Sequence, residues 1–493
     1  MGTVLFEARD LAFCYPAATE RVFSGASLRL YAGDKTALMG DNGSGKTTLL
    51  RLIAGELEPD HGAITRPAGV FLLKQEDTAS GGLSALEWLA GDWEQGPQVL
   101  AQAAALGFNP GDLDRPVESF SGGERKMLAL MAGFLRRPPL YLLDEPTNYL
   151  DGAAMARLAA AVKSYKGACL VVSHDRAFLD GCVDKVLELE RKTLRAYSGN
   201  YSSYAAQKSA AFALAEKKKE KLEREITGLR QMERNYRDWG AAKEKEKKGA
   251  ADKGFIGARA ARLQKRSARA AERARQKIED LEREKPFIEK VRHARLPGSA
   301  NVFLQADGLA KKAGGKALFS GLSFNLKAGS RLCVQGGNGT GKTTLLRVIA
   351  GELTPDEGRV TYTKSARLFY LPQFWREEPG ILKGEDYFPG ESLQAGCTML
   401  DHLGARGELL FCPLKNLSEG QRRKVALARF LVYGADIALL DEPTTHQDLR
   451  SIKVLEEALL TYQGVLLFIT HDAEFRRTLN AESINLGGPP SHT

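Results

Sequence analysis

The residues whose types and spacing could do chemistry form one five-part set that occurs twice. Each set contains, in order, a glycine-rich loop ending in Lys-Thr, a glutamine, a Ser-led turn, an apolar run ending in Asp-Glu, and a Ser/Thr-His-Asp triplet. The first set begins at Gly40–Thr47 and the second at Gly336–Thr343, and matching members lie 296 to 298 residues apart. A constant separation indicates a duplicated domain rather than scattered matches.

The two glycine-rich loops, here called the phosphate loops, lie between a short apolar run and a predicted helix. Their backbone N–H groups can surround phosphates at the positive end of that helix. Lys46 and Lys342 should reach the β- and γ-phosphates, and Thr47 and Thr343 should bind Mg²⁺ through their hydroxyls. The predicted nucleotide ligands here are Gly40, Asp41, Asn42, Gly43, Ser44, Gly45, Lys46, Thr47 and Thr48, and Gly336, Gly337, Asn338, Gly339, Thr340, Gly341, Lys342, Thr343 and Thr344.

The acidic pairs end two apolar runs that read as buried parallel strands, 140–143 and 437–440. The first acid of each pair can orient the Mg²⁺ shell, and the second is placed to polarise an attacking water. The histidines could contact the γ-phosphate, and the glutamines could sense the same phosphate and the metal. We therefore predict catalytic roles for Glu145, Glu442, His174 and His471, and Mg²⁺ ligation by Thr47, Gln75, Asp144, Thr343, Gln373 and Asp441.

Each of these features has a simpler interpretation when it stands alone. A single glycine-rich loop can be a tight turn without a ligand, and an isolated His174 would more often be a buried histidine with a satisfied hydrogen bond. Two complete sets in the same order favour the nucleotide site over these alternatives.

The Ser-led turns, here called the signature turns, span residues 121–124 and 418–421. Elsewhere they would be read as helix N-caps. Combined with the phosphate loops and acidic pairs, they resemble those of the ABC ATPase family. In that family two cassettes pack head to tail, so the resemblance implies that Lys46 shares an ATP with Ser418 and Lys342 shares one with Ser121. The implied ATP contacts are Gln75, Gln373, Ser121, Gly122, Gly123, Ser418, Gly420 and Gln421.

The two sets are not identical, so we expect two unequal sites. The family stacks an aromatic ring on adenine, a position that Tyr15 fits in the first copy and Ala313 takes in the second. The second signature turn has Glu419 where the family usually has glycine. The segments that follow the acidic pairs, here called the D-loops, read Asn-Tyr-Leu-Asp at 148–151 and Thr-His-Gln-Asp at 445–448.

A chain of 493 residues predicts more than one domain. We expect an α/β protein with two tandem ABC-type nucleotide-binding domains, 1–205 and 296–486, joined by a long α-helical hairpin at 206–295, with a tail at 487–493. Residues 205–295 contain 27 Lys or Arg and 15 Asp or Glu, a net charge of +12. Because the whole chain carries +9, the remaining residues carry a net charge of −3. Two helical runs, 207–237 and one ending near 291, flank a glycine cluster that begins at Gly240 and predicts a break.

The arrangement of two cassettes around a basic hairpin, preceded by the tyrosine-rich run 197–204, resembles the ABC-F proteins. These act on ribosomes, and the linker is similar to that of their antibiotic-resistance branch, the Vga and Lsa type. The resemblance implies binding at the ribosomal E site, with the linker tip displacing drugs near the peptidyl-transferase centre. The linker residues expected to contact rRNA or tRNA are Trp239, Lys243, Lys245, Lys247, Lys248, Lys253, Phe255, Arg259, Arg262, Lys265 and Arg266.

Two other functions fit the same residues. One is a housekeeping ABC-F translation factor without a drug effect, and the other is the soluble ATPase subunit of a transporter. No apolar run is long enough to cross a bilayer and no signal sequence begins the chain, so we expect a cytoplasmic monomer with internally paired cassettes, without a membrane subunit or DNA. A charged, solvated coiled coil is the simpler interpretation of the linker.

Overall fold

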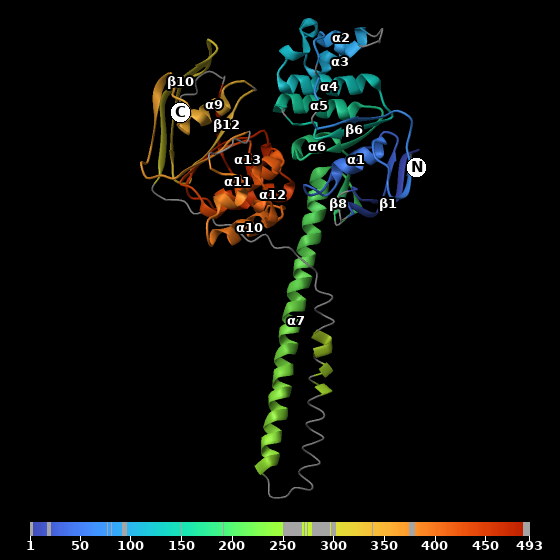
Figure 1. Cartoon of the computed structure of the whole chain (residues 1–493), viewed down its shortest axis with the longest axis vertical. Helices are drawn as coiled ribbons and strands as arrows, with labels where there is room; N and C mark the ends of the chain where they lie inside the picture. The colour runs from blue at the N-terminus through green and yellow to red at the C-terminus, as the bar shows by residue number, and fades with distance from the viewer. Residues whose placement is uncertain are drawn as a thin grey trace. The chain divides into compact units, whose positions relative to one another are not determined.

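The computed structural model describes most of the chain. The described residues are 3–16, 21–75, 77–79, 81–90, 96–148, 150–190, 192–249, 269–270, 272–273, 275–278, 296, 302–337, 339–373 and 380–486. They divide into two compact units, one of residues 1–204 with 291–493 and one of residues 205–290. The first unit contains two copies of an α/β domain, here called the first cassette (blue to green in Figure 1) and the second cassette (yellow to red).

The first cassette alternates strands with helices. Its elements are β1 (Val4–Phe13), β2 (Phe23–Tyr31), β3 (Lys35–Met39), α1 (Lys46–Ala54), β4 (His61–Thr65), β5 (Val70–Leu73), α2 (Ala85–Ala90), α3 (Gly96–Leu106), η1 (Pro110–Asp114), η2 (Val117–Ser119), α4 (Gly122–Arg136), β6 (Leu140–Asp144), α5 (Gly152–Ser164), β7 (Ala168–Val172), α6 (Arg176–Cys182), β8 (Lys185–Glu190) and β9 (Thr193–Ser198).

The second cassette repeats this order. Its elements are β10 (Phe303–Ala313), β11 (Lys316–Lys327), β12 (Arg331–Gln335), α9 (Lys342–Ile349), β13 (Glu357–Tyr362), β14 (Leu368–Leu371), η3 (Gly384–Tyr387), α10 (Ser392–His402), η4 (Gly407–Phe411), η5 (Leu414–Asn416), α11 (Glu419–Tyr433), β15 (Ile437–Asp441), α12 (Leu449–Leu460), β16 (Val465–Ile469), α13 (Ala473–Thr478) and β17 (Glu482–Asn485).

One sheet in each cassette positions the candidate site. The first cassette orders its strands β5-β6-β7-β3-β8-β9, and the second orders them β14-β15-β16-β12-β17. The neighbours β6, β7 and β3 are parallel, as are β15, β16 and β12. The carboxyl ends of neighbouring parallel strands meet at one edge, where open α/β sheets bind their ligands. The phosphate loop, the acidic pair and the histidine triplet each follow one of these strands.

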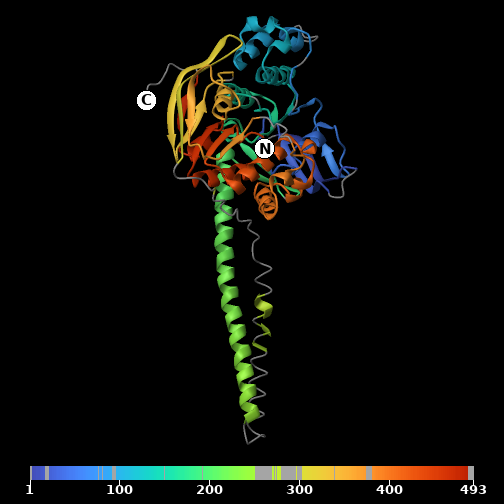
Figure 2. The same ribbon diagram turned by 60° about the vertical axis from the view of Figure 1, so that its left-hand side comes forward.

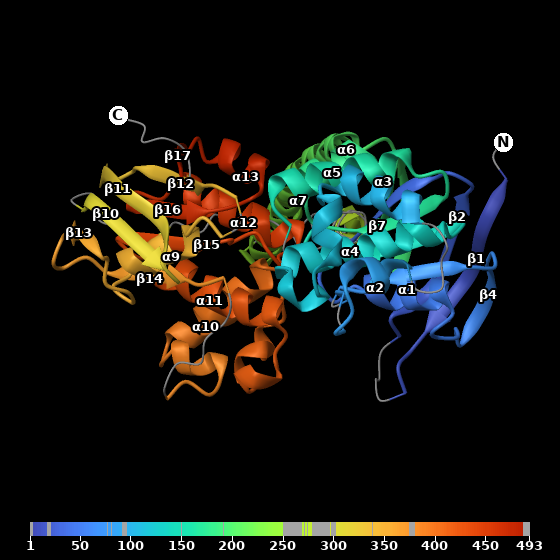
Figure 3. The same ribbon diagram turned by 90° about the horizontal axis from the view of Figure 1, so that it is seen from above.

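The short apolar runs form these strands because they are covered on both faces. Every residue of β6, β7, β15 and β16 is buried, the pattern of a parallel sheet packed between helices. The strands predicted from the sequence lie within these elements and within β3 and β12. A second, antiparallel sheet in each cassette, ordered β2-β1-β4 and β11-β10-β13, packs over α1 or α9. Figure 3 shows β10, β11 and β13 as a sheet of their own in the second cassette.

Two tandem α/β domains with a helical insertion between them confirm the predicted fold class. The insertion begins with α7 (Tyr201–Gly249), an unbroken helix of 49 residues (green in Figure 2). The predicted break begins later than Gly240, because α7 continues through this residue and ends at Gly249, a second glycine of the predicted cluster. A single glycine costs a helix about 1 kcal/mol, and the Ala, Lys and Glu residues at 241–248 are strong helix formers that offset it.

The described part of the returning arm is helical at 269–270, 272–273 and 275–278 and lies beside α7 (Figures 1 and 2). Lys277 forms an ion pair with Glu225 of α7 at 3.0 Å, and Leu222, Ile226 and Ile278 are buried. This contact is the antiparallel pairing expected of a hairpin.

The predicted linker tip lies mostly outside the described residues. These positions are Lys253, Phe255, Arg259, Arg262, Lys265 and Arg266. Trp239, Lys243, Lys245, Lys247 and Lys248 belong to α7, without described side chains. No helix in the described part of the chain is long and apolar enough to cross a membrane.

In each cassette an aromatic ring fills the contact between the signature helix and the strand that follows it, but the ring comes from the strand in one cassette and from the helix in the other. In the first cassette Gly133 of α4 faces Tyr141 of β6, and a Cβ added to Gly133 would lie 2.2 Å from the tyrosine oxygen. The matching positions in the second cassette are Phe430 and Ala438, and Phe430 stacks on Phe369 with ring centroids 4.8 Å apart. The aromatic ring lies on strand β6 in the first cassette and on helix α11 in the second, and in both it fills the space between the helix and the strand.

We predict that Gly133→Ala destabilises the first cassette by about 1–3 kcal/mol, because the new methyl group overlaps the ring of Tyr141. Chemical unfolding of the chain measures this. In a chain that already carries Tyr141→Ala, the substitution Gly133→Ala should cause no further loss of stability, because the ring it overlaps is gone. Gly152→Ala is the matched control, since a Cβ at Gly152 meets nothing within 4 Å. A Gly133→Ala chain as stable as the control would contradict the packing described here.

Candidate nucleotide-binding sites

The first phosphate loop joins β3 to α1 and has the geometry of an anion cradle. Helix α1 begins at Lys46, after Gly45 in a left-handed conformation with φ of 103°, and no side chain caps it. Its first N–H groups therefore face the loop, where the helix dipole favours negative charge. The Lys46 ammonium is buried and donates to the carbonyls of Gly40 at 2.7 Å and Asp41 at 3.0 Å.

Two glycines of this loop have no room for a side chain. A Cβ at Gly40 would lie 2.8 Å from the Leu189 carbonyl and from Ser44 Oγ, and both Gly40 and Gly45 have positive φ. The buried Ser44 Oγ has no hydrogen-bond partner within the described residues. A tight loop with an unsatisfied hydroxyl directed inward fits a bound polyphosphate.

The second phosphate loop repeats this geometry between β12 and α9. Lys342 Nζ donates to the carbonyls of Gly336 at 2.8 Å and Gly337 at 2.9 Å. A cavity of about 230 Å³ gathers most of the predicted second-site residues. It is lined by Leu318, Gly339, Gly341, Lys342, Thr343, Thr344, Gln373, Asp441, Glu442, Ile469 and His471. Asn338 lies outside the described residues.

The metal ligands predicted at each loop face one another. Thr47 Oγ1 donates to Asp144 Oδ2 at 2.8 Å, and Thr343 makes the equivalent bond to Asp441. Burial raises the pKa of Asp144, and it raises that of Asp441 to about 6, because a carboxylate loses hydration there. The buried Asp441 Oδ2 has no hydrogen-bond partner in the described structure. A hydroxyl beside an unsatisfied carboxylate oxygen fits a hard cation such as Mg²⁺.

The predicted catalytic glutamates have strained backbones. Glu145 and Glu442 adopt φ of 46° and 50°, a conformation that costs a residue other than glycine about 1–3 kcal/mol. Their N–H groups bond to the neighbouring strand, Glu145 to the Val172 carbonyl at 2.9 Å and Glu442 to the Ile469 carbonyl at 3.0 Å. Burial raises the pKa of both side chains, that of Glu442 to about 7. A carboxylate with a raised pKa accepts a proton from water more readily.

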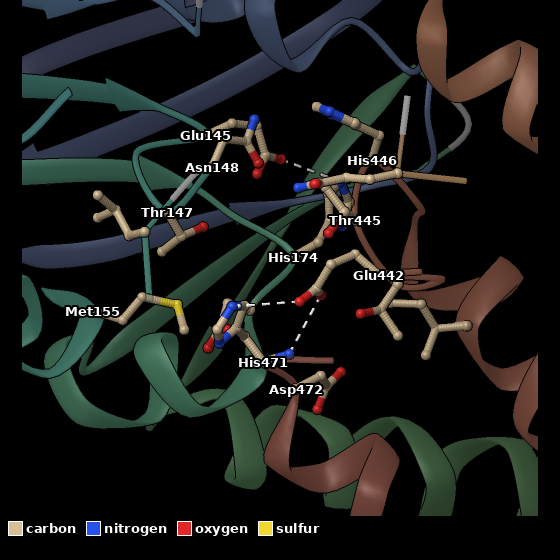
Figure 4. Close-up of a pocket in the computed structure, with 15 residues that line it drawn as sticks. Glu145, Thr147, Asn148, Met155, His174, Glu442, Thr445, His446, His471 and Asp472 are labelled. Atoms are coloured by element: carbon tan, nitrogen blue, oxygen red, sulfur yellow. Dashed lines mark hydrogen bonds and ion pairs between the residues drawn. The ribbon is translucent and has the colours of Figure 1, made fainter. Parts of the chain in front are cut away.

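Each glutamate faces the histidine of its own cassette. His174 Nε2 lies 3.4 Å from Glu145 Oε1, and His471 Nε2 lies 3.4 Å from Glu442 Oε1 (Figure 4). Burial and the nearby phosphate-loop lysine lower the pKa of both imidazoles. The histidines are therefore neutral near pH 7, and each pair is a polar contact rather than a salt bridge.

The glutamine segments are anchored by buried cations that the sequence analysis did not identify. Lys126 of α4 donates to the carbonyls of Lys74 at 2.8 Å, Gln75 at 2.9 Å and Asp77 at 3.1 Å. Burial lowers the pKa of Lys126 to about 8. The signal in the sequence was weak, since a lysine two residues after a signature turn reads as an exposed helix position.

The matching residue of α11, Arg423, forms more bonds. Its guanidinium donates to the carbonyls of Pro372, Gln373, Asp441 and Glu442, so it connects the glutamine segment to the predicted catalytic glutamate. It is 1% exposed. The segments beside Glu145 and Glu442 are therefore supported by different cations.

The signature turns begin α4 and α11 through capping boxes. The hydroxyl of Ser121 accepts a hydrogen bond from the Glu124 N–H, and the hydroxyl of Ser418 accepts one from the Gln421 N–H. In return, the side chain of Glu124 or Gln421 accepts from the N–H of the serine. Within the described residues no hydrogen bond joins either serine to the opposite phosphate loop. The shared ATP stays a prediction.

The D-loop of the second cassette does contact the opposite phosphate loop. Asn42 donates from its backbone to Asp448 Oδ2 and from its side chain to the His446 carbonyl, both at 3.3 Å. In the other direction, Asp151 acts electrostatically on Lys342 and His471. These contacts have the direction expected of head-to-tail cassettes.

Between the cassettes lies a cavity of about 120 Å³ (Figure 4). Glu145, His174 and Asn148 face it from the first cassette, and Glu442, His471 and His446 face it from the second. This volume is large enough for several waters, and residues of both candidate sites line it.

The adenine contact predicted for Tyr15 differs between the copies. Tyr15 lies beside α1, with its hydroxyl 3.0 Å from Thr48 Oγ1 and its ring edge-on to Phe13. Ala313 ends β10 at a tight Gly314-Gly315 hairpin. The first site alone has an aromatic ring at this position.

Comparisons with known proteins agree with this geometry. The profile of the family described as "ABC transporter" matches residues 23–148 and 319–445. Ribosome protection protein VmlR of Bacillus subtilis (strain 168) is 30% identical over 482 residues, 95% of this chain and 85% of that protein. Energy-dependent translational throttle protein EttA of Mycobacterium tuberculosis (strain ATCC 25618 / H37Rv) is 31% identical over 509 residues, 92% of this chain and 86% of that protein.

Among solved structures, archaeal ribosome recycling factor aABCE1, in complex with archaeal ribosomal stalk protein aP1, is similar in fold. It has a TM-score of 0.66 and 19% identity, covering 98% of this chain and 88% of that one.

The contact between the cassettes includes a buried ion pair. Arg176 of α6 donates to Glu456 of α12 at 3.0 Å, with side chains 4% and 9% exposed, and it lies 3.2 Å from the half-exposed Glu474. Removing one partner of a buried pair leaves an uncompensated charge.

We predict that Arg176→Met destabilises the chain by about 3–5 kcal/mol, since Glu456 is left buried and unpaired. Arg176→Met with Glu456→Met should recover much of that loss, and urea unfolding of both variants measures it. Glu474→Gln is the matched control, with an expected loss of about 1 kcal/mol or less because this pair is solvent-screened. Equal losses in the single and double variants would contradict a coupled pair.

Proposed function

The chain belongs to the ABC-F family of ATPases, and from this premise we propose that it hydrolyses ATP at two composite sites and uses the cycle to act on the ribosome. One observation carries the proposal. Each cassette holds a complete set of phosphate loop, acidic pair and histidine; the D-loop of the second cassette contacts the first phosphate loop, and Asp151 of the first D-loop acts electrostatically on Lys342. A site completed by the second cassette converts nucleotide binding into motion between the two.

The chemistry we propose divides among the residues of each site. Lys46 and Lys342 bind the β- and γ-phosphates, while Thr47 with Asp144 and Thr343 with Asp441 hold Mg²⁺, which supplies neutralising charge when bound. Glu145 and Glu442 accept a proton from the attacking water. The neutral His174 and His471 position the γ-phosphate beside them.

The coupling to a partner follows from differential binding. ATP favours the closed pair of cassettes because only that form provides both halves of each site. Hydrolysis removes the γ-phosphate, and the preference for the closed form falls. The buried Arg176 and Glu456 pair gives the cassettes a contact around which this change occurs.

The linker supports an RNA partner. Its surplus of 12 positive charges between residues 205 and 295 would neutralise phosphates and release counterions. Trp239 and Phe255 could stack on unpaired bases. We propose that the closed form binds the E-site region and that the linker tip, acting near the peptidyl-transferase centre, shifts tRNA or rRNA until a bound antibiotic leaves. The names of VmlR, a ribosome protection protein, and aABCE1, a ribosome recycling factor, support this partner.

A housekeeping translation role is the second candidate. EttA, a translational throttle protein by name, is as similar to this chain as VmlR is, at 31% against 30% identity. A transporter subunit is a weaker candidate, because it assigns no role to the basic linker. Both ribosomal functions place the protein in the cytoplasm as a monomer without a DNA partner.

We predict that Glu145→Gln with Glu442→Gln lowers ATP hydrolysis by about 10²-fold or more, because the proton acceptors are lost while the phosphate loops remain. With ATP this variant should sediment with ribosomes, and without ATP it should not. Lys46→Ala with Lys342→Ala is the control and should fail to sediment under both conditions. Loss of ribosome association in the glutamine variant would count against the mechanism.

Expression in a drug-sensitive bacterial host separates the two ribosomal functions. We predict raised inhibitory concentrations for lincosamides, streptogramin A and pleuromutilins with the wild-type chain, because the linker displaces these drugs. The Glu145→Gln, Glu442→Gln variant should give no protection. Unchanged values for all three classes, together with ATP-dependent ribosome binding, would favour the housekeeping factor.

A further inference from the structure

The two signature helices differ at one buried position behind the D-loops. In α11 this position is Lys424, which forms an ion pair with Asp448 of its own D-loop at 2.6 Å. The side chains are 2% and 1% exposed. The matching residue of α4 is Met127, also buried, and the matching aspartate is Asp151. One D-loop is therefore backed by a cation and the other by a thioether.

Asp448 links four segments. One carboxylate oxygen caps α12 by accepting from the N–H and hydroxyl of Ser451, both at 2.8 Å. The other accepts from Lys424 and from the backbone N–H of Asn42 in the opposite phosphate loop. Lys424 also donates to the Leu403 carbonyl at 2.7 Å, which joins the end of α10 to the same cluster.

The Lys424 ion pair also controls the charge beside the first phosphate loop. Burial works to raise the pKa of Asp448, but the ion pair and hydrogen bond with Lys424, together with the hydrogen bonds from Ser451, outweigh it and hold the pKa below its usual value. The carboxylate is therefore ionised and paired, so it can lie close to Lys46 and a polyphosphate with little net repulsion.

Asp151 is supported less. It caps α5 by accepting from the Ala154 N–H at 2.9 Å, and within the described residues no ion pair neutralises it. Its charge acts instead on Lys342 and His471 of the second site. An unpaired carboxylate near Lys342 cancels part of the attraction that this lysine exerts on a triphosphate.

We propose that Lys424 is a positioning residue for the first nucleotide site, that it acts through Asp448 on the opposite phosphate loop, and that Met127 is where the second site lacks this support. The proposal rests on the ATP binding proposed above. The D-loop at the first site presents a neutralised, fixed carboxylate, and the D-loop at the second site presents an uncompensated one. Glu419, beside the first-site signature serine, adds a separate charge that is the same in all the variants below.

The two positions can be exchanged in chains that keep a single site. A Lys342→Ala chain retains the first site, and a Lys46→Ala chain retains the second, both with Glu145→Gln and Glu442→Gln to stop turnover. Mg·ATP binding is measured by titration calorimetry. Lys424→Met should weaken ATP binding at the first site by about tenfold, the size expected for one uncompensated charge near the phosphates. It should leave the second site unchanged.

Met127→Lys should tighten ATP binding at the second site by about the same factor and leave the first unchanged, with Met127→Leu as the matched control. Two variants separate positioning from general damage to the fold. Lys424→Arg should restore first-site binding, and Lys424→Met with Asp448→Asn should recover it in part, because Asn can still cap α12 without a charge. The melting temperature of each nucleotide-free chain shows whether it is folded.

The possible outcomes distinguish this proposal from the one on which it rests. If neither single-site chain binds Mg·ATP, the proposed ATPase function fails. The positioning role of Lys424 is overturned if both single-site chains bind Mg·ATP but each substitution changes the affinity of both sites equally. It is also overturned if neither Lys424→Met nor Met127→Lys changes the affinity of either site. A folded Lys424→Met, Asp448→Asn chain that binds no better than Lys424→Met would also overturn it.

Discussion

The structure depends on the convergence of three parallel strand ends in each cassette. β3, β7 and β6 bring the phosphate loop, the histidine and the acidic pair to one edge, and β12, β16 and β15 do the same in the second cassette. These strands are largely buried, and the polar residues that could do chemistry lie where the strands end. The strained backbones of Glu145 and Glu442 lie at this edge, each held by a bond to the neighbouring strand. The rigidity of the sheet is what makes such strained positions sustainable.

A second constraint is the burial of cations behind these strand ends. Lys126 and Arg423 satisfy backbone carbonyls of the glutamine segments, and Lys424 neutralises a D-loop aspartate. A buried charge is costly unless it is paired or fully hydrogen-bonded, so these residues hold their neighbours in one arrangement. They also connect each signature helix to the segments that surround a nucleotide. The two halves of the chain, similar in fold, use different residues for this connection.

Polar contacts link the cassettes, and one of them is a buried ion pair. Arg176 with Glu456 and Asn42 with Asp448 cross from one cassette to the other, and a cavity lies between the facing Glu–His pairs. The strength of such contacts depends strongly on geometry. When the cassettes separate slightly, water reaches both partners and the interaction between them loses most of its strength. An interface built in this way suits the proposed cycle, in which the cassettes close and part with the nucleotide.

The sequence by itself determined the duplicated fold, the strands and the loops that carry Lys46, Asp144 and their counterparts, because local spacing and continuous apolar runs encode them. It placed the break in the linker helix too early, at Gly240, where strong helix formers on one side outweigh a single glycine. Only the tertiary structure decided the roles of Lys126, Arg423 and Lys424, and the pairing of Arg176 with Glu456 across 280 residues. These side chains read as ordinary surface charges on a helix. Their burial and partners come from segments distant in the chain, which residue type and spacing cannot specify.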